Sequence, residues 1–257
     1  RAFLHDCARC LALAYQHRLQ LLPGGDVDLS AWPSPFILPT LTKDAQCEEQ
    51  SPAFSFILRL LRAAELLHAD AEWWGVDASM ATWLGQPPAT QLLHLRRAWW
   101  EHILWDARAL PALRLPPWLE RRWSAIVDAV CAAVVAGPTA VWTPLTDLRP
   151  ELERAGLLAA PGVTANLPAL RDAAASGVWN LARFLIHVAL PRLGLLELAN
   201  VAGQPHLRPT EEGRAWLRTA LTRHTTAEEA ADAEPSAPAL EVDVPYHDLY
   251  LPLPDFP

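Results

Sequence analysis

One segment of this 257-residue chain occurs twice. Residues 57–67 (ILRLLRAAELL) and 186–196 (IHVALPRLGLL) are both largely apolar and both end in a Leu-Leu pair. In each copy a short polar stretch and a segment ending in Trp-Leu follow, at 74–84 and at 207–217. The first halves align at an offset of 129 residues and the second halves at 133, so the second copy has four extra residues in its connecting loop. Because both copies are expected to adopt one local structure, this repeat constrains the fold strongly.

Each copy has the pattern typical of a winged helix. An apolar helix ends at the Leu-Leu pair, a polar hairpin follows, and a capped second helix carries Trp-Leu on its buried side. In the second copy Thr210 is suited to the N-cap, with Glu211 and Glu212 in the first helical turn. We therefore expect a mostly α fold in which two winged-helix-like units with small β wings bracket a helical middle.

Proline and glycine divide the rest of the chain. Pro23-Gly24-Gly25 is expected to end a first helix over 1–22. Further helices are predicted over 89–108, 117–136 and 144–158. We predict five segments: an N-terminal helix and Pro-rich entry at 1–51, the first winged-helix-like unit with its following helix at 52–110, a helical middle at 111–176, the second winged-helix-like unit at 177–223, and an acidic linker with a terminal strand at 224–257.

The 12 tryptophans mostly lie within apolar helical patterns, so most of them are expected to be structural. Trp32 and the second residue of each of two doublets, Trp74 and Trp100, are the expected exposed exceptions.

The net charge of −8 comes entirely from the C-terminal end of the chain. Eight of the 29 acidic residues lie in 225–257, which contains no Lys or Arg. The other 21 acidic residues balance the 21 basic ones, so residues 1–224 are neutral. Strong non-specific binding to nucleic acid needs many clustered cations. The neutral body therefore argues against such binding but is compatible with a local basic patch.

Arginines gather around the second wing and the helix that follows it. A winged helix contacts DNA through its recognition helix and its wing, where Arg reaches phosphate or a groove. The candidate nucleic-acid-binding residues are Arg192, Arg208, Arg214, Arg218 and Arg223. The adjacent Glu211 and Glu212 would repel phosphate, so an ordinary solvated helix face is the alternative interpretation of the same residues.

No catalytic motif is present in the sequence. It has no phosphate-binding loop, no His-Glu-x-x-His, no Gly-x-Ser-x-Gly and no glycine-rich dinucleotide turn. Cys7 and Cys10 have a spacing that metal and redox sites use, but a second such pair is missing and their apolar flanks favour a buried helix. They are weak metal candidates, and we expect neither a cofactor nor enzyme activity.

The four cysteines do not form a disulfide framework, which fits a reducing cytoplasm. No run of 18 apolar residues is present, so we expect no transmembrane helix and no membrane partner. The chain opens in a helical pattern without an initiator Met, which predicts a fragment of a longer protein.

Further motifs frame the two copies: Pro39–Leu41, Leu60–Leu67, Trp83-Leu84, Gln91–Trp99, Leu193–Leu196, Leu207–Thr210 with Gly213, and Leu240–Val244. Their order resembles the helicase-associated winged-helix region found beside XPB-type helicases and in stand-alone bacterial helicase-associated proteins. The resemblance implies an accessory module for DNA or for a helicase partner, without the ATPase motor. Asp77 and Met80 depart from the family pattern, which implies a purely structural role for the first copy.

Two functions follow from these observations. The first is a non-catalytic, DNA-binding or helicase-associated module of a DNA-processing protein that contacts DNA through the second unit. The second is a protein–protein adaptor that binds no nucleic acid, in which the winged helices are packing blocks and the acidic tail recruits a partner. An exposed basic face would favour DNA, and an exposed apolar patch would favour the adaptor.

Overall fold

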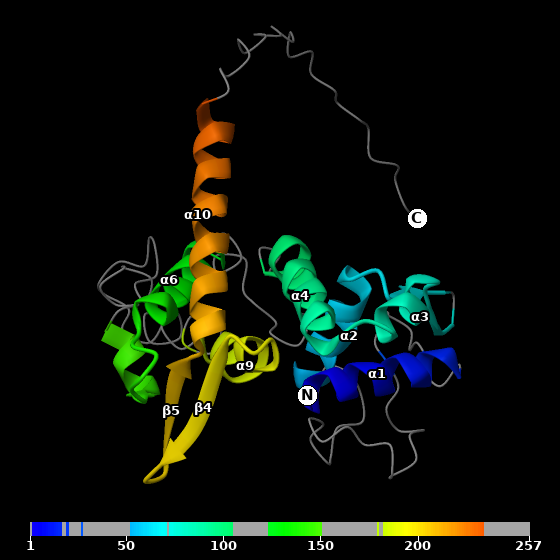
Figure 1. Ribbon diagram of the computed structural model, residues 1–257, viewed down its shortest axis with the longest axis horizontal. Coiled ribbons are helices and arrows are strands. Elements are labelled where there is room, and N and C mark those ends of the chain that lie inside the picture. The colour runs from blue at the N-terminus through cyan, green and yellow to red at the C-terminus, as the bar shows by residue number, and fades with distance from the viewer. Residues whose placement is uncertain are drawn as a thin grey trace, which may run out of the picture. The chain divides into compact units, whose positions relative to one another are not determined.

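The computed structural model describes residues 2–16, 19–20, 27, 52–70, 72–104, 123–150, 179 and 182–233 (Figure 1). Within these ranges helices dominate, and the strands form two small antiparallel sheets. The prediction of a mostly α fold is therefore confirmed. The chain divides into a unit of residues 1–222 and a unit of residues 223–257. None of the helices in the described ranges is both long and apolar enough to span a membrane.

The first copy of the repeat consists of a helix, a short hairpin and a second helix. Its elements are α2 (Pro52–Ala63), β1 (Leu67–Ala69), β2 (Trp74–Val76) and α3 (Ser79–Leu84). The two strands pair antiparallel, with Leu67 opposite Val76 and Ala69 opposite Trp74.

The second copy has the same order of elements with longer strands. A helical segment made of η7 (Leu185–Ala189) and α9 (Leu190–Arg192) leads to β4 (Leu196–Val201), β5 (Gln204–Pro209) and α10 (Glu211–Ala233). Figure 1 shows this hairpin in yellow and α10 in orange. The strands pair antiparallel from Leu196 opposite Pro209 to Val201 opposite Gln204.

The first helix of each copy ends in the same backbone corner. Glu65 and Gly194, which align in the repeat, both have positive φ values, 55° and 67°. A residue with positive φ ends a helix and turns the chain away from the helix axis, and glycine adopts this conformation most easily. In both copies the next amide donates to the carbonyl five residues earlier at 2.9 Å, from Leu66 to Leu61 and from Leu195 to Leu190.

A second pair of equivalent hydrogen bonds joins this corner to the start of the next helix. The Asp77 amide donates to the Leu66 carbonyl at 3.1 Å, and the Thr210 amide donates to the Leu195 carbonyl at 3.2 Å. The repeat seen in the sequence is thus also a repeat of backbone hydrogen bonds.

A third strand, β3 (Thr143–Pro144), pairs with β5 and gives the sheet order β3-β5-β4. The sequence predicted a helical stretch near 144–158 but no strand before it. The described residues agree with the helix from residue 145: the 3-10 helix η6 (Leu145–Asp147) follows the strand, and a helical turn continues to Pro150. Strands of two residues are too short to give the alternating pattern by which strands are recognised.

The N-terminal helix α1 (Ala2–Tyr15) is shorter than the predicted 1–22. The Leu19 carbonyl accepts the Trp74 amide at 3.0 Å, and Gln20 forms a bridge with Trp73. The backbone after α1 therefore pairs with the first hairpin in place of continuing the helix.

Helix α4 (Pro88–Ala98) continues through the π-helical turn η3 (Trp99–Ile103), in agreement with the helix predicted from residue 89. Pro88 occupies the first turn, where its missing amide proton costs nothing. Helix α6 (Trp123–Ala136) ends before Gly137-Pro138, as predicted.

The two tryptophan doublets behave differently. Trp100 is half-buried next to the buried Trp99, in the expected direction. Trp74 is only 1% exposed while Trp73 is half-buried, so that expectation was wrong. The register of β2 points Trp74 into the core.

Helix α10 extends to Ala233, ten residues into the segment predicted as a linker. The residues concerned are rich in alanine and glutamate, which have high helix propensity. Several predicted features lie outside the described residues: Trp32, the helix start at Pro117, the helical stretch beyond residue 150, and the strand at 240–244.

Candidate functional site

The start of α10 is anchored by one hydroxyl. Thr210 Oγ1 accepts the Gly213 amide at 2.9 Å, so the predicted N-cap is confirmed. The same hydroxyl donates to the Gly194 carbonyl at 2.8 Å. One side chain thereby fixes α10 to the corner that precedes the hairpin.

The β4–β5 hairpin ends in an exposed tip. Ala202 and Gly203 turn the chain with φ values of 50° and 81°. Val201 is 46% exposed, and no atom lies within 4 Å of the place that a Cβ on Gly203 would take. The tip is therefore an open surface of the described part of the chain.

Arg208 is engaged within the sheet. It stands opposite Glu197 in the β4–β5 register, its Nε donates to Glu197 Oε2 at 2.9 Å, and its Nη2 bonds to the same oxygen. Its guanidinium carbon lies 4.6 Å from the centre of the Trp142 ring. The charge of Arg208 is thus already paired and one face of its guanidinium is covered.

Arg192 is engaged with its own helix. Its Nη1 donates to the Val188 carbonyl at 3.0 Å and to the His187 carbonyl at 3.3 Å. Burial lowers the pKa of Arg192, and the nearby Asp6 acts in the opposite direction. Arg192 therefore caps carbonyl groups at a helix end.

Arg214 and Arg218 lie one turn apart on α10 and share a face of the helix. Arg218 is exposed, and the structure describes no hydrogen bond or ion pair of its guanidinium group. Arg214 is half-buried, and its Nε has no hydrogen-bond partner in the described structure. Arg223 belongs to the second unit of the chain.

One of the two acidic residues beside these arginines is neutralised by a residue that sequence reasoning missed. Arg96 on α4 is 2% exposed, bonds through Nη1 to Glu212 and donates through Nε to the Leu193 carbonyl at 2.8 Å. Glu211 stays exposed. The signal was available, because Arg96 lies on the same helical face as Leu92 and the buried Trp99.

Tryptophans join α10 to the helix of the first half. The rings of Trp99 and Trp216 are 6.5 Å apart, and those of Trp100 and Trp216 meet edge to face at 5.7 Å. Trp216 is half-buried, whereas the next residue, Leu217, is completely buried. The prediction that both residues of each Trp-Leu pair are buried is therefore correct only in part: Leu217 is more buried than Trp216 here, and in the first copy Trp83 is buried whereas Leu84 is 42% exposed.

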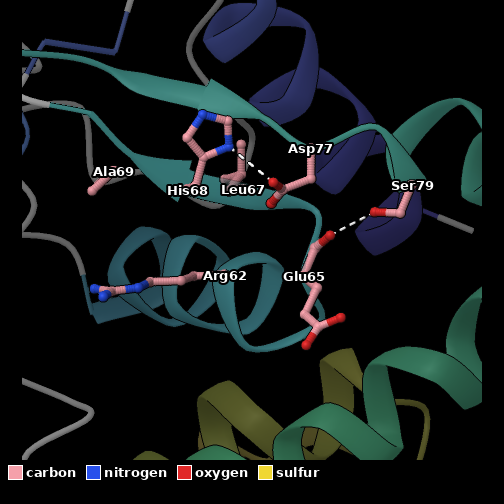
Figure 2. A pocket seen from close by; sticks show the side chains of 7 residues that line it. All are labelled: Arg62, Glu65, Leu67, His68, Ala69, Asp77 and Ser79. Carbon is pink, nitrogen blue, oxygen red and sulfur yellow. Dashed lines mark hydrogen bonds and ion pairs between the residues drawn. The ribbon is translucent and has the colours of Figure 1, made fainter.

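The first copy carries an open pocket of about 580 Å³ (Figure 2). His68 and Asp77 both line it, with His68 Nδ1 3.0 Å from Asp77 Oδ1, while His68 Nε2 lies 3.5 Å from Oδ1 of Asp70 beside the pocket. The sequence did not predict this group, because the hairpin register, with His68 opposite Gly75, brings it together. A Cβ on Gly75 would lie 2.6 Å from His68 Nε2, so the ring packs directly over this glycine.

Ser79 lies in the same pocket, but its hydroxyl donates to the Glu65 carbonyl at 2.5 Å and not to His68 (Figure 2). A nucleophilic serine needs its base within hydrogen-bond distance. This arrangement instead ties the start of α3 to the end of α2. Among the residues that the structure describes, no group of three His, Cys, Asp or Glu side chains is placed to hold a metal.

Cys7 and Cys10 are completely buried on α1. Burial is the main cause that raises the pKa of both thiols above the ordinary value, and it raises the pKa of Cys131 on α6 to about 12. Metals and electrophiles react with the thiolate form. The environment therefore favours the interpretation of Cys7 and Cys10 as small apolar core residues.

No protein-family model, curated protein or solved structure matches this chain. The resemblance to helicase-associated regions rests on the sequence motifs and stays a prediction.

Proposed function

We propose that this chain is a non-catalytic accessory module of a DNA-processing protein and that its second repeat contacts DNA. The observation that carries the proposal is the pair Arg214 and Arg218, one turn apart on the helix that directly follows the wing. Winged-helix proteins contact DNA through a recognition helix and a wing, and these two arginines lie on the helix that begins where the second hairpin ends.

The contacts remove two of the five arginines from the proposed DNA-binding set, and Arg223, which belongs to the second unit of the chain, is also left out of it. Arg208 is paired with Glu197 and stacked on Trp142, and Arg192 is bonded to helix carbonyls. Breaking either arrangement to reach phosphate would cost the existing charge-assisted bonds. Arg214 and Arg218 require no such exchange, and the Arg96–Glu212 ion pair reduces the nearby negative charge.

Only two cations are proposed, and residues 1–224 are neutral overall, so binding should be modest and sensitive to salt. We would measure it by fluorescence anisotropy of labelled single-stranded, duplex and forked DNA, with the full chain in a salt series. The Arg214→Ala/Arg218→Ala variant should bind about tenfold more weakly, with a salt slope reduced by about two.

A matched control keeps the same net charge change on other elements. Arg62→Ala/Arg97→Ala removes two exposed arginines, on α2 and α4, and should leave the affinity nearly unchanged. If both double variants lose the same DNA affinity, the loss is explained by net charge alone and not by the position of Arg214 and Arg218. No binding at low salt to any of the three DNA forms would overturn the proposal.

A protein–protein adaptor is the second candidate function. The exposed Val201 at the hairpin tip and the half-buried Trp100 and Trp216 favour it. If a partner is retained by the full chain and lost by the Val201→Asp variant, while DNA binding is absent, the adaptor becomes the better account.

A further inference from the structure

A second pocket, of about 370 Å³, lies where α1, α4 and α9 meet. Its walls are largely apolar and come from Phe3, Leu4, Leu92 and Pro191. Two side chains of opposite charge, Asp6 and Arg192, also line it. The volume is at the lower end of the range of small-molecule pockets.

Asp6 is an unusual residue for the buried side of an apolar helix. It is 2% exposed, and within the described part of the chain no hydrogen bond or ion pair engages its carboxylate. Burial raises the pKa of Asp6, while the charges of Arg9, His5 and Arg192 lower it in part. A buried carboxylate without a hydrogen-bond partner is costly, so a donor in the pocket would stabilise it.

Arg192 offers the complementary charge at a fixed place. Its Nη1 is held by the Val188 and His187 carbonyls, which orient the guanidinium group. Its Nε is buried without a hydrogen-bond partner in the described structure, and the described bonds do not use Nη2. No ion pair joins Arg192 to Asp6 among the described contacts, so the two charges line one pocket unpaired.

We propose that this pocket binds a small zwitterion of the amino-acid type with an apolar side chain. The ligand's ammonium group bonds to Asp6 and its carboxylate to Arg192, while its side chain packs against Phe3, Leu4 and Leu92. A simple cation would leave Arg192 Nε and Nη2 without a partner, while Nη1 keeps its bonds to the helix carbonyls, and a simple anion would leave Asp6 without a partner. A zwitterion satisfies both and adds no net charge to a buried site.

Isothermal titration calorimetry of the full chain with leucine tests this pocket. N-acetyl-leucine lacks the ammonium charge and leucine methyl ester lacks the carboxylate, so each probes one end of the ligand. We expect leucine to bind, and each blocked analogue to bind about tenfold to a hundredfold more weakly. An analogue that binds as well as leucine, or no binding of leucine at millimolar concentration, would overturn the proposal.

Two variants locate the binding. Asp6→Asn keeps the shape of the side chain and removes its charge, so the variant should fold. It should bind leucine about tenfold to a hundredfold more weakly, as the blocked analogues do with the unchanged protein. Leu92→Trp fills the pocket from the partly exposed side of α4 and should also abolish binding, which covers the case that Asp6→Asn fails to fold. Undiminished leucine binding by either folded variant would place the ligand elsewhere and contradict the proposal.

Discussion

At the start of its second helix, the second repeat has Gly213 where the first repeat has Met80. A Cβ on Gly213 would lie 2.3 Å from the Leu195 carbonyl oxygen and 2.4 Å from the Leu195 Cα, so α10 packs directly on the backbone of the corner. In the first repeat the Met80 amide donates to the Asp77 carbonyl at 3.0 Å, and its side chain packs half-buried against the core. At equivalent positions, the second repeat therefore packs its helix directly on backbone atoms, and the first repeat packs a side chain against the core.

The hydroxyl that binds the corner carbonyl also differs in position and in use. Thr210 precedes α10, caps it and bonds to Gly194. Ser79 is the first residue of α3, and the one side-chain hydrogen bond described for it is to Glu65. No side-chain hydrogen bond caps α3. The second repeat is therefore the more strongly fixed of the two, and its six-residue strands fit the same conclusion.

The largest expected effect is that of Gly213→Ala. The new methyl group has to displace the backbone of Leu195, so we expect the free energy of unfolding to fall by about 3 kcal/mol. Met80→Ala, at the aligned position, should cost about 1 kcal/mol because Met80 is only half-buried. Urea denaturation followed by tryptophan fluorescence measures both. Equal losses would show that the two corners pack alike.

Arg96→Ala should have the next largest effect, a loss of about 2 kcal/mol, because the buried Leu193 carbonyl loses its donor. Glu212→Gln removes only the charge of a side chain that is 75% exposed and should cost less than about 0.5 kcal/mol. Thermal denaturation of the two variants separates the hydrogen bond from the ion pair. A larger loss in Glu212→Gln would contradict this division.

Thr210→Ala is expected to cost about 1.5 kcal/mol, since it removes the N-cap of α10 and a bond to the corner. Ser79→Ala removes one exposed hydrogen bond in the first repeat and should cost about 0.5 kcal/mol. The comparison of the two midpoints in urea is the measurement. A cost of Ser79→Ala as large as that of Thr210→Ala would reverse the assigned strengths.

The smallest effects concern the residues with positive φ. Gly194→Ala should cost about 1 kcal/mol, because alanine is strained in this conformation. Glu65→Gly relieves the same strain in the first repeat, so it should be neutral or stabilise by about 0.5 kcal/mol. Equilibrium unfolding should therefore show a loss of stability for Gly194→Ala and none for Glu65→Gly. A destabilised Glu65→Gly would show that the Glu65 side chain is needed.

The sequence was most informative where a pattern repeats locally. The aligned Leu-Leu pairs located both corners, and Thr210 with Gly213 in the next turn located the start of α10. The sequence was less informative where the local structure depends on pairing with a segment far away in the chain. Strand β3 forms because Thr143 pairs with Leu207 of β5. Helix α1 ends before the residue predicted because Gln20 pairs with Trp73 of the first hairpin.

The candidate sites show the same limit. The position of Arg214 and Arg218 after the β4–β5 hairpin follows from their spacing along α10. The pairing of Arg208 with Glu197 follows from a strand register, and the burial of Asp6 beside Arg192 follows from helix packing. Neither register nor packing can be read from one sequence without its partner segments.

Residue-resolved amide hydrogen exchange tests most directly the claim that the two repeats share one corner but differ in strength. The amides to compare are Leu66 with Leu195, and Asp77 with Thr210, each of which donates within its own corner. We predict protection of all four amides, with slower exchange at Leu195 and Thr210 than at their first-repeat counterparts. Rapid exchange at Leu195 and Thr210, or protection confined to the first repeat, would contradict this account.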